Sequence, residues 1–220
     1  WDRTMFADAF MSNAVSGLNV LTSESKPVSV YINEMYWGIY NARQRMDEQF
    51  ISSKLKVDKS KILLLENNGE VKSGGSKAKK ELKKLVKTIE KGSVDLLLEY
   101  VDAKNLIDYF IIETYFNNTD WPNNNVLFYK VDSKNGKWNF IPKDSDYGMN
   151  YISNIAFKHN TFAYAAKKEN SLLVKLFNVL ISDHQFKIQF SKRAKELLRT
   201  DLSNEILLSK YANFVDEYKT

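Results

Sequence analysis

Residues 105–130 read "NLIDYFIIETYFNNTDWPNNNVLFYK", and this stretch decides how the rest of the chain is interpreted. Its first half is apolar nearly all round, which predicts a central buried helix over Ala103 to Phe116. An asparagine-rich loop and a run of strand-forming residues follow at once. The loop is either a plain turn between two elements or the place of a catalytic pair, Asp120 and Asn125.

A predicted β-hairpin returns a second polar motif, "PKDSDYG" at 142–148, to this loop. Asn135-Gly136 separates two strand-like runs, and this dipeptide is a strong hairpin signal. Counting outward from the turn puts Asn125 opposite the region of Asp144 and Asp146, within a step or two of register. The sequence therefore predicts one polar cluster where the two strands end.

The members of this cluster are Asp120, Asn125, Asp144 and Asp146. They offer oxygen ligands only, which suit Mg²⁺ or Mn²⁺ better than zinc or copper. Asp144 and Asp146 are expected to share one side of an extended segment, and a divalent cation would offset the repulsion among the carboxylates. Asp and Asn also shape ordinary turns, but two such motifs joined by a hairpin favour a metal or phosphate site.

Composition argues against several other kinds of site. The 220 residues include no cysteine, which excludes disulfides and cysteine-ligated zinc, and His159 and His184 give little support for a histidine zinc site or a Ser-His-Asp triad. No apolar run approaches the roughly 20 residues of a membrane helix. The chain begins at Trp1 without methionine, and we interpret it as a domain excised from a longer protein.

The net charge of +5 is concentrated in one segment, from Lys77 to Lys91. Its apolar residues fall on one helical face, which predicts an amphipathic helix with a lysine-rich solvated side. A patch for an anionic ligand is the alternative. Because no aromatic residues are interleaved with the lysines, nucleic-acid binding is not expected.

The order of the motifs follows a pattern known from phosphoryl transfer. In kinase-like enzymes a catalytic-loop Asp precedes a metal-binding Asn by four intervening residues, and a metal-binding Asp follows a short hairpin. Asp120 and Asn125 have this spacing, and Asp146-Tyr147-Gly148 imitates the Asp-Phe-Gly motif.

Three segments together resemble the CotH family, atypical protein kinases named after a bacterial spore-coat protein. They are "VYINEMYWGIYNARQRMDEQFI" at 30–51, the stretch 105–130 quoted above, and "GKWNFIPKDSDYG" at 136–148. The first is similar to the hairpin of the family's N-lobe, the second to its central helix and catalytic loop, and the third to its metal-binding end.

The resemblance implies an α+β, two-lobed, atypical protein-kinase-like fold over residues 1–220, with a β-rich N-lobe (1–75) and a mostly helical C-lobe (76–220). It implies a phosphotransferase that uses ATP and Mg²⁺ or Mn²⁺ to phosphorylate Ser/Thr hydroxyls of a protein substrate. By motif, Asp120 is the catalytic residue, Asn125 and Asp144 hold metal, and Asp146 is an alternative or additional ligand. The family also implies a secreted, cell-surface or spore-coat location.

The phosphate-binding cation is expected from the first lobe. Arg43 and Arg45 share one face of a predicted strand and suit multidentate phosphate contact, or else are exposed surface arginines. Gln44 departs from the glutamate that the family commonly has there. A catalytically weak or inactive surface binding or structural module is therefore the alternative function. A glycosidase is disfavoured because Asp144 and Asp146 lie on one side of the chain.

Overall fold

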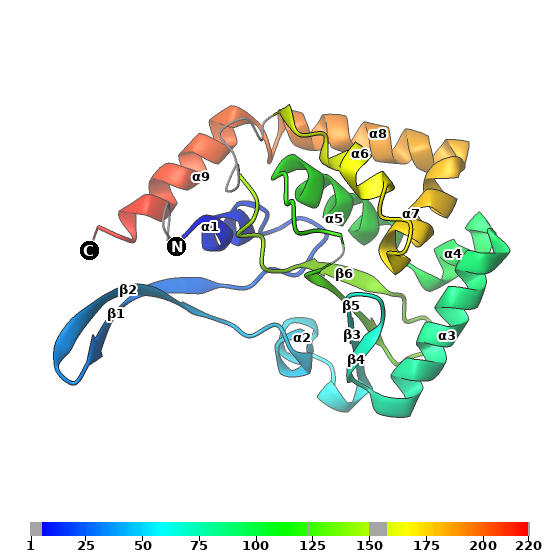
Figure 1. The fold of residues 1–220 in the computed structure, drawn as a ribbon, viewed down its shortest axis with the longest axis horizontal. Coiled ribbons are helices and arrows are strands. Elements are labelled where there is room, and N and C mark those ends of the chain that lie inside the picture. The colour runs from blue at the N-terminus through cyan, green and yellow to red at the C-terminus, as the bar shows by residue number, and fades with distance from the viewer. Residues whose placement is uncertain (1–5, 123, 150–157, 220) are drawn as a thin grey trace.

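The computed structural model describes residues 6–122, 124–149 and 158–219 and confirms a mixed α+β architecture (Figure 1). The first part of the chain contains the helices α1 (Ala7–Ala14) and α2 (Glu48–Leu55), the 3-10 turn Lys59–Lys61, and the strands β1 (Ser25–Ile32), β2 (Met35–Arg43), β3 (Ile62–Glu66) and β4 (Glu70–Ser73). The remainder contains α3 (Gly75–Lys91), α4 (Val94–Tyr100), α5 (Ala103–Tyr115), β5 (Val126–Val131), β6 (Asn139–Pro142), α6 (Thr161–Ala166), α7 (Leu172–Ser182), α8 (His184–Arg199) and α9 (Asn204–Asp216).

A four-stranded antiparallel sheet in the order β4-β3-β5-β6 lies at the centre of the body. Both faces of the sheet are buried, which explains why β3 and β5 are apolar without alternation. Leu63 and Leu65 face the main core, and Ile62 and Leu64 face a smaller one beneath α2. The strand pair predicted on either side of Asn135-Gly136 is present as β5 and β6, and it belongs to this larger sheet.

Helix α5 is buried on nearly every side, as its apolar sequence predicts. The helix begins after Asp102, whose side chain accepts a hydrogen bond from the backbone N–H of Asn105. Its buried Asp108 forms an ion pair with Arg193 of α8. The loop that contains Asp120 therefore begins at the end of a helix that buried contacts hold in place.

The β1–β2 pair forms a separate two-stranded ribbon that extends away from the body (Figure 1). Asn33 and Glu34 form the turn between the strands, and both adopt left-handed backbone angles. The register shifts between Val30, which pairs with Gly38, and Tyr31, which pairs with Tyr36. Near the turn, large side chains such as Trp37, 59% exposed, face solvent.

The strand β4 lies directly before the lobe boundary expected at residue 75. Strand β3 lies before residue 75 and β5 after it, yet the two pair along five residues from Ile62↔Val131 to Glu66↔Leu127. The two-lobed division near residue 75 stays a prediction. Any lobe that contains β3 and β4 also contains β5 and β6, because these strands share backbone hydrogen bonds.

The helix expected over residues 77–91 is confirmed as α3, with Leu85 and Ile89 buried and its lysines on the outer side. Ser171 caps α7, and its side chain accepts a hydrogen bond from the backbone N–H of Val174. Within the described residues, none of the helices combines the length and the apolar character needed to cross a membrane.

Candidate functional site

The loop after α5 holds Asp120 through hydrogen bonds on both sides of the residue. Its backbone N–H donates to Asn118 Oδ1 at 3.3 Å. Its carboxylate accepts from Asn124 Nδ2 and from Asn125 Nδ2, both at 3.0 Å. The asparagines therefore orient the carboxylate in addition to shaping the loop.

The hairpin brings the two predicted motifs together. Val126 pairs with Pro142 at the last rung of the β5–β6 ladder, which places Asn125 opposite Lys143. Asn125 Nδ2 also approaches the backbone oxygen of Asp144 at 3.4 Å. Asn125 therefore lies one residue outside the Asp144–Asp146 region counted from the sequence, within the step or two of register that was allowed.

The backbone around Asp144 differs from the extended segment expected. Asp144 adopts a left-handed conformation with φ of 53°, and Gly148 N donates to Ser145 O at 2.8 Å to close a turn. The chain turns because β6 ends at Pro142, so no strand partner holds the residues that follow. The extended segment expected at Asp144 is therefore absent, although the carboxylates of Asp144 and Asp146 still interact electrostatically.

Partial burial raises the pKa of Asp144 above its ordinary value, and the charge of Asp8 raises it further. Burial also raises the pKa of Asp146, with added repulsion from Asp144 and Asp8. The charge of Asp120 contributes to both shifts. Mutual repulsion of this kind indicates a site where a cation would be favourable.

Asp8 of α1 is a site residue that the sequence reasoning missed. Its carboxylate accepts from the backbone N–H of Ser145 at 2.9 Å and forms an ion pair with Arg43 at the end of β2. Asp8, Arg43 and Ser145 are far apart in the chain, and no local motif around Asp8 signals this role. The predicted cation Arg43 is thus positioned next to the acidic cluster by α1.

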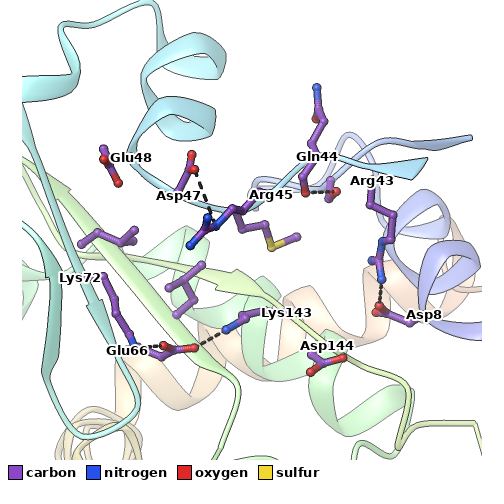
Figure 2. Close-up of a pocket in the computed structure, with 14 residues that line it drawn as sticks. Asp8, Arg43, Gln44, Arg45, Asp47, Glu48, Glu66, Lys72, Lys143 and Asp144 are labelled. Carbon is purple, nitrogen blue, oxygen red and sulfur yellow. Dashed lines mark hydrogen bonds and ion pairs between the residues drawn. The ribbon is translucent and has the colours of Figure 1, made fainter. Parts of the chain in front are cut away.

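A pocket of about 470 Å³ opens beside this cluster, between the end of β2 and the four-stranded sheet (Figure 2). Asp144 lies at one side, and Leu64 and Leu127 contribute apolar surface. The basic side chains that line the pocket are Arg43, Arg45, Lys72 and Lys143.

Glu66 forms ion pairs with both lysines that line the pocket. Its carboxylate pairs with Lys72 at 2.6 Å and with Lys143, the residue directly before Asp144. Although burial opposes the effect, hydrogen bonds from Lys143 and Lys72 lower the pKa of Glu66. One signal for this group is visible in the sequence, namely that the charged residue Glu66 ends the apolar run "KILLLE".

Arg45 and Gln44 occupy different positions at the pocket. The Arg45 side chain is 91% exposed and lies 4.0 Å from Asp47, so it makes only a weak ion pair. Gln44 lines the pocket, and its side-chain oxygen accepts a hydrogen bond from the backbone N–H of Glu24 at 3.3 Å. In Figure 2 the Gln44 side chain extends away from Asp144. The departure at residue 44 therefore removes no visible contact to the acidic cluster.

The side chains available as metal ligands suit an ion that also keeps water or substrate phosphate in its coordination shell. Within the described ranges, no group of three or more His, Cys, Asp or Glu side chains is arranged to hold a metal ion. An asparagine and one or two aspartates remain, and Mg²⁺ commonly completes such a shell with water and substrate phosphate. Asn125 and Asp144, with Asp146 beside them, suit this type of partial site.

When compared with known protein families, residues 1–218 match the family described as CotH kinase protein. The chain belongs to the CotH kinase family. The match covers almost the whole chain and includes the loop, the hairpin and the pocket described above. No match was found among curated proteins. Membership makes this chain a kinase-like protein and confirms the resemblance carried by its motifs.

Proposed function

We propose that this member of the CotH kinase family is an ATP- and divalent-metal-dependent phosphotransferase that acts on protein Ser/Thr hydroxyls. The observation that carries the proposal is the juxtaposition of Asp120, Asn125 and Asp144 beside a pocket lined by both basic and acidic side chains. Family membership supports kinase-type chemistry, and the loop spacing supports the roles of the residues.

In this proposal the nucleotide occupies the pocket of Figure 2. Its volume lies in the range that small-molecule ligands need. The apolar surface of Leu64 and Leu127 suits the base, and the phosphates face Arg43 and Lys143. Arg45, which is highly exposed, is free to turn toward a ligand. Arginine and lysine side chains beside a polyphosphate stabilise it because charged hydrogen bonds are strong in a partly closed site.

Asn125 and Asp144 would hold Mg²⁺ or Mn²⁺, with Asp146 as an additional ligand. When bound, the metal would neutralise charge on the phosphates. Asp120 would orient the acceptor hydroxyl and accept its proton, and its two asparagine partners keep the carboxylate in one orientation. Catalysis in such a site comes mainly from positioning and charge neutralisation.

Transfer from labelled ATP to the chain itself and to a general acceptor protein tests the function, with Mn²⁺ and Mg²⁺ in separate reactions. Asp120→Asn and Asp144→Asn are expected to lower transfer by about a hundredfold to a thousandfold while leaving the fold intact. Asp132→Asn is a matched control, since Asp132 lies at the far end of β5 and pairs with Lys77. Transfer retained in both site variants would refute the assignment.

The alternative is a surface binding or structural module that keeps the fold without turnover. Gln44 is the observation that favours it, because the family commonly has glutamate at this position. A Gln44→Glu variant distinguishes between the phosphotransferase and the binding module. A large gain in transfer would identify residue 44 as the cause of a weakened enzyme, and equal transfer would show that glutamine is compatible with activity.

A further inference from the structure

We propose that Tyr109 and Glu113 of α5 are positioning residues that hold the loop carrying Asp120 in its active conformation. The catalytic part of this inference rests on the proposed function, whereas its structural part can be tested without it. The two residues lie one helical turn apart, so their side chains leave the same face of α5. Each contacts the loop on a different side of Asp120.

The first anchor lies two residues before Asp120. Asn118 Nδ2 donates to Glu113 Oε2 at 2.9 Å, and the backbone N–H of Asn118 donates to the backbone oxygen of Glu113 at 3.1 Å. Asn118 Oδ1 then accepts from the backbone N–H of Asp120. A continuous chain of hydrogen bonds therefore runs from a carboxyl group on α5 to the backbone of Asp120.

The second anchor lies one residue after Asp120. Trp121 Nε1 donates to the hydroxyl oxygen of Tyr109 at 3.0 Å, and both side chains are fully buried. The Trp121 ring also meets the ring of Phe110 edge-on, with centroids 5.0 Å apart. Removal of the Tyr109 hydroxyl would leave a buried indole N–H without an acceptor, which is a costly state.

These anchors act on the backbone of Asp120, whereas Asn124 and Asn125 act on its carboxylate. Neither Tyr109 nor Glu113 reaches the surface, since Tyr109 is 0% exposed and Glu113 is 1% exposed. Both therefore act through the loop and touch no substrate. Their loss should displace the reacting carboxylate while the nucleotide pocket keeps its shape.

Glu113 is best understood as a neutral acid. Burial raises its pKa to about 8, against the lowering effect of the Asn118 hydrogen bond and with a further rise from the charge of Asp8. Tyr109, the other titratable neighbour, has a pKa raised by burial and stays protonated. A glutamine offers the same acceptor to Asn118 in a neutral side chain. Glu113→Gln should consequently preserve the anchor, and Glu113→Ala should remove it.

Steady-state transfer by the full chain at pH 7 provides the first test. We expect Tyr109→Phe and Glu113→Ala to lower kcat by at least about tenfold, with the KM for ATP changed less than about twofold. Glu113→Gln should retain kcat within about threefold. Tyr115→Phe is the matched control, because the Tyr115 hydroxyl on the same helix donates to Leu202 O at 2.9 Å instead of to the loop.

Hydrogen–deuterium exchange of the same variants provides the second test and needs no activity. Backbone amides of residues 117–121 should exchange faster in Tyr109→Phe and Glu113→Ala than in the wild type. Exchange in β3 and β5 should stay unchanged, and Glu113→Gln and Tyr115→Phe should match the wild type throughout. Unchanged exchange of the loop in the first two variants would overturn the proposal.

The two tests separate the two proposals. A wild-type chain that transfers no phosphate would refute the proposed function, and the exchange pattern would still decide whether α5 holds the loop. An active wild type whose kcat is insensitive to Tyr109→Phe and Glu113→Ala would overturn the positioning role alone. Equal loss of kcat in Glu113→Gln and Glu113→Ala would overturn the assignment of Glu113 as a neutral acceptor.

Discussion

The side chains at the candidate site suit the backbone conformation of the loop as well as the proposed chemistry. Asn117, Asn125 and Asp144 all adopt left-handed backbone angles, which asparagine and aspartate tolerate better than other residues with a side chain. The asparagine-rich character of the loop therefore has a conformational reason. The same residues also present the amide and carboxylate groups that the proposed chemistry needs. Asn125 and Asp144 therefore act as turn residues, and their assignment as metal ligands stays a prediction.

The titration of Glu113 leads to a prediction about stability and pH. Its pKa is about 8 in the folded chain against an ordinary value of 4.5. The folded state therefore keeps a proton that the unfolded chain has lost, and the stability contributed by neutral Glu113 is full below about pH 4.5 and is lost as pH rises to about 8. Glu113→Gln does not titrate. Relative to the wild type, this variant should gain on the order of 4 kcal/mol in unfolding free energy between pH 4.5 and pH 8.5.

Urea unfolding of both proteins at pH 5 and pH 8.5 measures this gain. Glu70→Gln serves as the control, because Glu70 is exposed on β4. Its difference from the wild type should change little between the two pH values. A Glu113→Gln difference that is equally constant would contradict the raised pKa.

Helices and strands position the site through a small number of buried contacts. Helix α5 carries both proposed loop anchors on one side and Asp108 on another. Asp108 is fully buried and accepts hydrogen bonds from Arg193 at 2.7 and 2.9 Å and from Asn19. The helix that supports the loop is therefore itself tied to α8 and to the segment after α1.

Arg193→Ala is expected to destabilise the fold because it leaves the buried Asp108 carboxylate without its charged partner. Loss of one member of a buried pair costs about 3 to 5 kcal/mol. Chemical denaturation measures the change, with Lys192→Ala on the exposed side of α8 as the control. A change below about 1 kcal/mol would show that Asn19 alone satisfies the carboxylate.

The whole molecule assembles the pocket from segments that are distant in sequence. Asp8 comes from α1, Arg43 from the end of β2, Glu66 from β3 and Asp144 from the turn after β6. A ligand that bridges these segments would bind the folded chain only. Binding and global stability should therefore be coupled.

ATP with Mn²⁺ is accordingly expected to raise the melting temperature. A ligand at about one hundred times its Kd adds about 2.7 kcal/mol, which corresponds to a rise of about 5 to 10 °C for a chain of this size. Differential scanning fluorimetry measures the shift, with Asp144→Asn and ATP without metal as controls. Absence of any shift at millimolar nucleotide would favour the binding-module alternative.

Much of the local structure follows from the sequence alone. Apolar residues all round predict the buried helix α5, the dipeptide Asn135-Gly136 predicts the β5–β6 hairpin, and the apolar face of residues 77–91 predicts α3. The same local signals bring Asn125 and Asp144 together, because a hairpin fixes which residues meet at its open end. These features depend on periodicity and short-range hydrogen bonds, which a sequence displays directly.

Other features were decided only by the tertiary structure. The hydrogen bond between Asp8 and Ser145 joins residues 137 positions apart, and no local pattern encodes such a contact. The joining of β3 to β5 and the two lysines held by Glu66 likewise depend on how finished elements pack. Sequence determined the elements and the paired motifs of this kinase-like chain. Packing decided which charges surround them, because electrostatic contacts depend on distance in space rather than on separation along the chain.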